Sequence, residues 1–123
     1  MKVGVIGCGG MGTTHYLSLK VLSSQMNVEV VALADCREEF LQKAAAEFPE
    51  ARTYTYGMEL IEHENLDAVH ICLPSYLHTE HAVAAMKRGM HVLVEKPVCL
   101  TREEGECLLQ AQKETGEKVM VGQ

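Results

Sequence analysis

The stretch KVGVIGCGGMG, residues 2–12, decides the fold of this chain. It begins as a short apolar run typical of a β-strand and continues into the pattern G-x-G-x-x-G, formed by Gly7, Gly9 and Gly12. We expect Gly7 to permit a tight turn, Gly9 to let backbone N–H groups approach a pyrophosphate, and Gly12 to let a helix pack closely on the strand. The stretch therefore predicts a strand, a phosphate-binding loop and a helix whose N-terminus faces the phosphates.

An acid at the end of the next apolar run supports a dinucleotide as the ligand. Residues 28–34 are mostly β-branched and apolar, as in a strand covered on both faces of a parallel sheet, and Asp35 follows them directly. Asp35 follows Gly12 at close to the spacing of about 20 residues at which such an acid accepts hydrogen bonds from the adenosine ribose. This favours NAD. Arg37 is either a solvated residue of a helix start or a guanidinium that holds a 2′-phosphate, so NADP stays possible.

Strand and helix patterns alternate along the rest of the chain. The expected strands are 3–6, 28–34, 52–56, 68–73, 91–94 and 118–121, and the expected helices are 11–22, 37–48, 57–64, 78–88 and 101–114. The alternating residues 52–56 are typical of a short edge strand, and Thr101 with Glu104 forms a capping box. The pattern predicts one α/β domain, residues 1–123, with the doubly wound parallel sheet of a Rossmann fold. It should have about six strands in the order 3-2-1-4-5-6 and helices on both faces.

Composition excludes several classes of function. The net charge of −6 opposes binding to nucleic acid or to an anionic membrane, because both need a basic surface. No segment has the features of a membrane span or a secretory signal peptide. The five cysteines form no C-x-x-C pair, which favours a reduced, cytoplasmic compartment. Cys72, His78 and His81 lie close in sequence but lack a second pair of ligands, so we predict no metal site.

Two further strand ends are expected to flank the nicotinamide side of the cofactor, because ligands lie outside the carboxyl ends of parallel strands. They are the segments 73–78, LPSYLH, and 95–97, EKP. The ammonium group of Lys96 could stabilise negative charge on a substrate oxygen, whereas the alternative is an ordinary surface lysine. His78 and His81 lie one helical turn apart, where either could meet the cofactor or face solvent.

The remaining cysteine and histidine candidates are weaker indications of a catalytic or binding role. Cys8 lies in the predicted phosphate loop, where a helix N-terminus can lower a thiol pKa, but we interpret it as a small residue that fills the loop. His70 is expected to be hydrogen-bonded within a strand, and His15, His63 and His91 are expected to be surface groups.

The glycine loop, Asp35, Pro74 with His78, and Glu95-Lys96-Pro97 occur in this order, and on these residues the chain resembles a known family over its whole length. It is similar to the N-terminal domain of the glucose-fructose oxidoreductase, inositol dehydrogenase and rhizopine-catabolism (Gfo/Idh/MocA) family. The tripeptide Glu-Lys-Pro is the most specific element. The chain departs from the family pattern at Pro74-Ser75, where Pro-Asn is usual.

The resemblance implies the NAD(P)-binding domain of an oxidoreductase that transfers hydride between a nicotinamide cofactor and a sugar, polyol or related carbonyl compound. Lys96 would position the substrate. The cofactor-binding residues so implied are Gly7, Cys8, Gly9, Gly10, Met11, Gly12, Asp35, Arg37, Leu73, Pro74, His78, Glu95 and Lys96.

The resemblance also implies a second, substrate-binding domain that supplies an acid–base histidine, and residues 1–123 resemble none of it. We therefore expect this chain to bind nucleotide without turning over substrate by itself, and the parent enzyme to be a homo-oligomer. Two other functions remain open. A stand-alone NAD-binding or redox-sensing module would use the same glycine loop and Asp35, and a methyltransferase-like nucleoside binder is a third possibility.

Overall fold

The computed structural model describes residues 1–23, 25–95 and 99–122. Its elements, in chain order, are β1 (Lys2–Ile6), α1 (Gly10–Ser23), β2 (Glu29–Ala34), α2 (Glu38–Glu47), β3 (Arg52–Tyr54), α3 (Gly57–His63), β4 (Ala68–Ile71), the 3-10 turn η1 (Ser75–Leu77), α4 (His78–Lys87), β5 (His91–Glu95), α5 (Arg102–Thr115) and β6 (Val119–Gly122). This alternation is the one that the sequence predicts.

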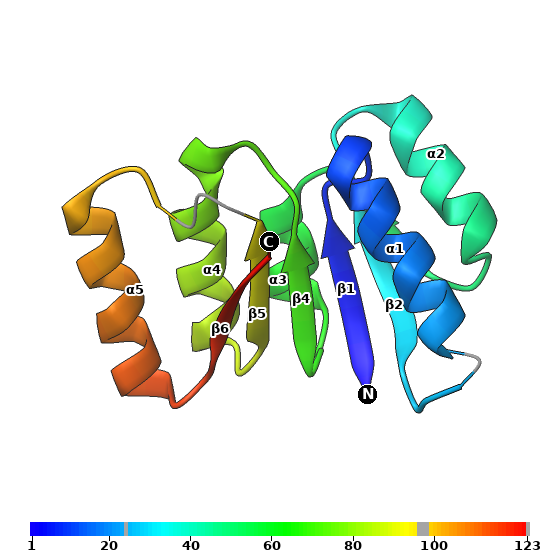
Figure 1. The fold of residues 1–123 in the computed structure, drawn as a ribbon. Helices are drawn as coiled ribbons and strands as arrows, with labels where there is room; N and C mark the ends of the chain where they lie inside the picture. The colour runs from blue at the N-terminus through cyan, green and yellow to red at the C-terminus, as the bar shows by residue number, and fades with distance from the viewer. Residues whose placement is uncertain (24, 96–98, 123) are drawn as a thin grey trace.

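The strands form one parallel sheet of six strands in the order β3-β2-β1-β4-β5-β6 (Figure 1). The predicted Rossmann order 3-2-1-4-5-6 is therefore confirmed. Strand β1 lies in the middle, where Val5 is level with Leu33 on one side and with His70 on the other. The chain reverses its direction of winding between β1 and β4, which places the expected ligand crevice at the carboxyl ends of these strands.

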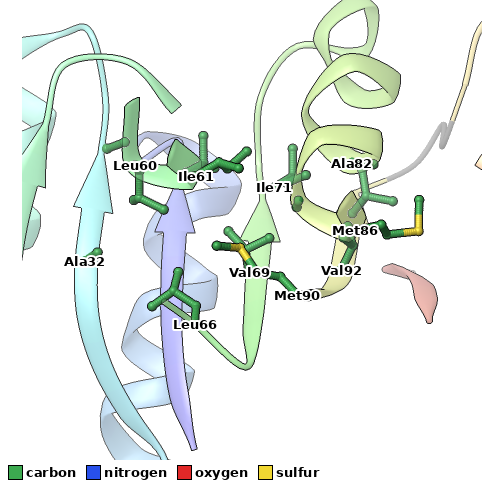
Figure 2. Close-up of a cluster of buried hydrophobic side chains, with 14 of the residues drawn as sticks. Ala32, Leu60, Ile61, Leu66, Val69, Ile71, Ala82, Met86, Met90 and Val92 are labelled. Atoms are coloured by element: carbon green, nitrogen blue, oxygen red, sulfur yellow. The ribbon is translucent and has the colours of Figure 1, made fainter. Parts of the chain in front are cut away.

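Two hydrophobic cores lie on opposite faces of the sheet. One lies under α1 and α2 and contains Val3, Val5, Cys8, Tyr16, Leu19, Val30, Leu33, Leu41 and Ala44. The other, shown in part in Figure 2, lies under α3, α4 and α5 and includes Leu60, Ile61, Val69, Ile71, Ala82, Met86, Met90, Val92, Val94 and Leu108. The expectation of helices on both faces is thus correct. It follows from alternation in the central strands, where successive side chains point to opposite faces.

Element boundaries differ from the predictions mainly at strand ends. Strand β3 is three residues long rather than five, and β4 ends at Ile71 rather than at residue 73. Pro74 cannot donate a ladder hydrogen bond, and a 3-10 turn that the sequence pattern did not predict connects it to α4. The capping box of α5 is present, because Glu104 N–H donates to Thr101 Oγ1 at 3.1 Å and the Glu104 carboxylate accepts from the Thr101 N–H.

Among the residues that the structure describes, no helix combines the length and the apolar character needed to cross a lipid bilayer.

Candidate functional site

The turn between β1 and α1 is held in shape by close contacts at two glycines. Gly7 has φ +93°, which side-chain-bearing residues rarely adopt, and its N–H donates to the Ala34 carbonyl at 2.8 Å. A Cβ atom on Gly12 would lie 1.9 Å from the Gly7 carbonyl oxygen. The first turn of α1 therefore packs directly on the end of β1, and only glycine permits this approach.

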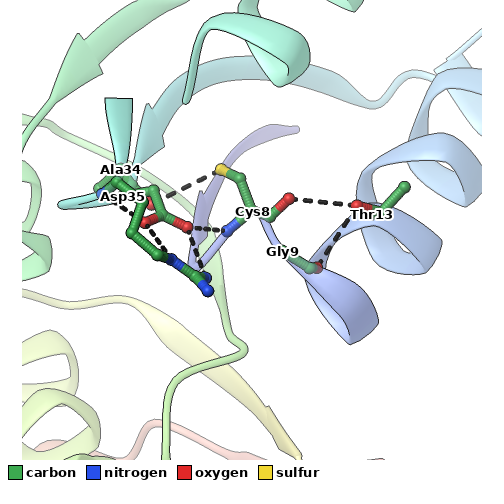
Figure 3. A network of polar contacts seen from close by, with 6 residues as sticks. Cys8, Gly9, Thr13, Ala34 and Asp35 are labelled. Atoms are coloured by element: carbon green, nitrogen blue, oxygen red, sulfur yellow. Dashed lines mark hydrogen bonds and ion pairs between the residues drawn. The ribbon is translucent and has the colours of Figure 1, made fainter. Parts of the chain in front are cut away.

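The loop between these glycines directs backbone groups toward the carboxyl edge of the sheet. Thr13 Oγ1 donates to the carbonyls of Cys8 and Gly9, at 3.1 Å and 3.4 Å (Figure 3). These bonds hold the loop carbonyls on the helix side. The first N–H groups of an α-helix have no acceptor within the helix, and the dipole makes this end positive. A Cβ atom on Gly10 would have no atom within 4 Å, so the outer surface of the loop is open to an anion.

Asp35 is bound to the glycine loop and to Arg37. Its Oδ2 accepts the Cys8 N–H at 2.8 Å, and its Oδ1 accepts the Arg37 N–H at 2.8 Å. The Arg37 guanidinium adds two longer bonds, each 3.2 Å, one to each carboxylate oxygen. The Asp35 side chain is only 4% exposed. Burial alone would raise the pKa of Asp35, but the hydrogen bonds from Arg37 and from the Cys8 N–H together hold this pKa below its ordinary value.

Arg37 covers the outer side of this carboxylate. Its side chain is 55% exposed, and the guanidinium carbon lies 4.2 Å from the centre of the Phe40 ring. Its Nη2 would lie 2.6 Å from a Cβ on Gly9, so the guanidinium lies against the phosphate loop. The interpretation of Arg37 as a purely solvated helix residue is therefore incomplete. The guanidinium links Asp35 to the loop.

A pocket of about 500 Å³ opens beside Asp35 at the carboxyl ends of β2 and β4. Apolar side chains predominate in its lining, which includes Ala34, Leu73 and Leu77. A hollow of about 760 Å³ lies elsewhere, near the start of β2, and its lining includes the acids Glu29, Glu47 and Glu50. The pocket beside Asp35 is also lined by three acids, Asp35, Glu59 and Glu62, so charge does not separate the two hollows. Because ligands of such sheets lie at the carboxyl ends of the strands, the pocket beside Asp35 is the better placed for a nucleotide.

The structure describes some of the residues that are expected on the nicotinamide side of the cofactor. Leu73 and Pro74 follow β4, and Glu95 ends β5 at the same edge of the sheet. His78 is only 1% exposed and its Nε2 lies 2.6 Å from the Leu73 carbonyl oxygen, so it braces the loop after β4. His81 is 5% exposed, so of the two alternatives for these histidines, the one in which they face solvent is wrong. Lys96 and Pro97 lie outside the described residues.

A group that the sequence analysis missed lies beside Glu95. His15 Nε2 is hydrogen-bonded to Glu95 Oε1, and its Nδ1 lies 3.0 Å from His70 Nδ1. The expectation of a hydrogen-bonded His70 is correct, but His15 is not a surface group, because its side chain is only 13% exposed. The period of the helix could have indicated that His15 faces the sheet, because His15 lies three residues after Gly12 and four before the buried Leu19.

Two thiols near the site, those of Cys8 and Cys72, are held in the neutral form, whereas Cys36, which lines the pocket beside Asp35, is exposed. Burial, followed by the charge of Asp35, raises the pKa of Cys8 to about 12, and burial raises that of Cys72 to about 12. None of the five cysteines forms a disulfide. Within the described ranges, no three His, Cys, Asp or Glu side chains are grouped so that they could hold a metal ion.

We predict that a thiol reagent at pH 8 labels the exposed Cys36 and Cys107 in the native protein at least about 100-fold faster than Cys8 and Cys72. The physical reason is that the reagent attacks thiolate, which burial suppresses at the two inner positions. Labelling in the absence of ligand followed by peptide mass spectrometry measures the rates, and labelling in urea is the control. Rapid native labelling of Cys8 would contradict the inert interpretation and restore a redox role.

The sequence model of an oxidoreductase family with an NAD-binding Rossmann fold matches residues 1–123. The chain is 31% identical over 122 residues to 4-carboxy-2-hydroxymuconate-6-semialdehyde dehydrogenase of Sphingobium, covering 99% of this chain and 38% of that protein. It is 33% identical over 113 residues to myo-inositol 2-dehydrogenase of Thermotoga maritima, covering 92% of this chain and 33% of that protein.

Among solved structures, scyllo-inositol dehydrogenase from Lactobacillus casei with bound NAD(H) and scyllo-inositol is similar, with a TM-score of 0.90 and 25% identity. The match covers 99% of this chain and 36% of that one. The chain thus spans about a third of the length of the curated relatives it matches. On the match over residues 1–123, the chain belongs to the Gfo/Idh/MocA oxidoreductase family, as its NAD-binding Rossmann domain.

Proposed function

We propose that residues 1–123 are the cofactor-binding part of an oxidoreductase that transfers hydride between NAD and a sugar, a polyol or a related carbonyl compound. The observation that carries the proposal is the bond between the Cys8 N–H and Asp35, at 2.8 Å. It joins the phosphate loop to the acid at the end of β2. The two parts of the G-x-G-x-x-G fingerprint that recognise pyrophosphate and ribose are therefore in contact.

The arrangement along the carboxyl edge supports one orientation of the dinucleotide. The pyrophosphate would lie on the loop of Gly7, Cys8, Gly9, Gly10, Met11 and Gly12, at the positive end of α1. The adenosine ribose would bond to Asp35, and the adenine would enter the apolar pocket beside it. The nicotinamide would then lie toward Leu73, Pro74, His78, Glu95 and Lys96, with no metal required.

The choice between NAD and NADP depends on Asp35 and Arg37. The carboxylate favours ribose hydroxyls and repels a 2′-phosphate, which carries about −1.5 to −2 charges. Arg37 lies directly over that carboxylate, 3.2 Å from it, and is the group that a 2′-phosphate would recruit. We propose NAD as the principal cofactor, with NADP tolerated through Arg37.

For the substrate, the family relationship supports hydroxyl-bearing carbon compounds. Among the relatives, one enzyme is named for myo-inositol and another for a semialdehyde. We propose that Lys96 positions the substrate oxygen, and that turnover requires a substrate domain like the part of these relatives that lies outside the match. Hydride transfer needs the substrate within near-attack distance of the nicotinamide, and a surface to hold it there.

Titration of the chain with NADH, monitored by calorimetry, tests the proposal. We expect saturable binding of NADH and no comparable binding of S-adenosylmethionine, because the latter lacks the pyrophosphate that the loop and helix end would bind. Preference for S-adenosylmethionine would refute the assignment and favour a nucleoside-binding module. If a longer protein containing this domain binds NADH but reduces or oxidises no polyol or carbonyl compound, a redox-sensing module becomes the better description.

A further inference from the structure

A largely buried contact joins α1 to the end of β5, and the proposed NAD site does not use it. Glu95 is the last residue of β5, and its carboxylate pairs with His15 Nε2 from the second turn of α1. The two side chains are 13% and 15% exposed, so this contact is largely shielded from water. His70, from β4 between them, completes the group, with its ring edge-on to that of His15 at 5.3 Å between ring centres. We call these three residues the His15–His70–Glu95 bridge.

The protons of the bridge follow from its partners. A carboxylate only accepts, so His15 Nε2 carries hydrogen and donates it to Glu95. Burial, followed by the charge of His15, lowers the pKa of His70 to about 4, so His70 is neutral at physiological pH. A neutral imidazole has one donor and one acceptor nitrogen. His70 Nδ1 can therefore donate to a neutral His15 or accept from a protonated one, at the same 3.0 Å separation.

His70 thus makes the contact with Glu95 independent of the charge of His15. In both charge states of His15, its Nε2–H stays directed at the carboxylate, and only the tautomer of His70 changes. Cys72 also interacts with Glu95, and its thiol is neutral because burial and then the Glu95 charge raise its pKa to about 12. The bridge therefore holds the Glu95 carboxylate in one position.

Its location points to one end of the cofactor. Helix α1 begins at the phosphate loop, whereas β4 and β5 lie on the side of β1 opposite to β2 and Asp35. If the adenosine ribose bonds to Asp35, the nicotinamide lies over the ends of β4 and β5. We propose that the His15–His70–Glu95 bridge positions the nicotinamide end of NAD, by fixing the end of β5 to the helix that binds the phosphates. This inference rests on the proposed NAD site.

Two ligands that differ only at that end test the inference. NADH contains the nicotinamide riboside, and ADP-ribose has the same adenosine, ribose and pyrophosphate without the nicotinamide ring. We expect His15→Ala to weaken NADH binding about fivefold and to change ADP-ribose binding less than about twofold. His15→Gln, whose amide Nε2 can donate in the place of the imidazole Nε2, should recover most of the NADH affinity. His91→Ala is the matched control, because His91 lies at the opposite end of β5 and is half-exposed.

The outcomes separate the two proposals. An equal loss of affinity for both ligands would show that His15 only supports the fold of the loop, and this would overturn the inference, as would unchanged binding of both. If the wild-type chain binds neither ligand, the proposed NAD site fails and the inference fails with it.

Long-range ¹H–¹⁵N NMR of the wild-type imidazoles is a second measurement that needs no variant. At pH values of about 6 to 8, it should show a hydrogen on His15 Nε2 and an uncharged His70 ring. An unprotonated His15 Nε2 there would contradict the bridge.

Discussion

Gly12→Ala is expected to lower the free energy of unfolding of the ligand-free chain by about 3 kcal/mol and its Tm by roughly 10 °C. The added methyl group would lie 1.9 Å from the Gly7 carbonyl oxygen and 2.7 Å from the Gly7 carbonyl carbon. Both atoms belong to the backbone, so no side-chain rotation relieves the clash. The helix must move away from β1, and it loses packing over the core that contains Val5 and Tyr16. Thermal and urea denaturation measure the change.

Gly10→Ala is the control for this experiment, because it makes the same chemical change two residues earlier in the same loop. A Cβ on Gly10 meets no atom within 4 Å, and its φ is not positive. Alanine is the better helix former by up to about 1 kcal/mol, so the stability should stay the same or rise slightly. Equal destabilisation by both variants would show that the loop rejects any side chain, and that the close approach at Gly12 is not the cause.

Most of the fold could be predicted because local patterns and global topology agree in this chain. The apolar runs of β1, β2 and β4 identify central strands, and parallel strands joined by helices admit essentially one handedness. What could not be predicted depends on tertiary contacts. β3 pairs only along Arg52–Tyr54, because one neighbouring strand supports it, and the residues beyond it lead into α3. An edge strand has no second partner to set its length.

The candidate site was predictable to the extent that position in the chain determines chemistry. Asp35 could be assigned because the end of β2 always meets the β1–α1 loop in this topology. The bond from Cys8 and the covering guanidinium of Arg37 could not be read from sequence, since they depend on side-chain conformation. The same holds for the His15–His70–Glu95 bridge, whose members come from three different elements. His70 and Glu95 follow His15 in sequence by 55 and 80 residues. Helical and strand periods indicate which face each one occupies, but not that they meet.

Asp35→Ala is expected to weaken NADH binding about 100-fold and NADPH binding less than about 10-fold. The variant removes the charged acceptor of the adenosine ribose hydroxyls, and hydrogen bonds to a charged group contribute about 1.5–3 kcal/mol each. It also releases the Arg37 guanidinium, which is 3.2 Å from the carboxylate and would then be available to a 2′-phosphate. Calorimetric titration of both nucleotides against each variant measures the change.

The ratio of the two affinities is the informative quantity. Removing Asp35 also takes the acceptor from the Cys8 N–H, and this distortion of the loop should affect both nucleotides equally. A change in the NADH to NADPH ratio therefore isolates the ribose contact. Arg37→Ala is the matched control: it frees two acceptor positions on Asp35, so NADH affinity should hold or increase while NADPH affinity falls. Equal weakening of both nucleotides by Asp35→Ala would remove the ribose role, and Asp35 would then be an internal support of the glycine loop.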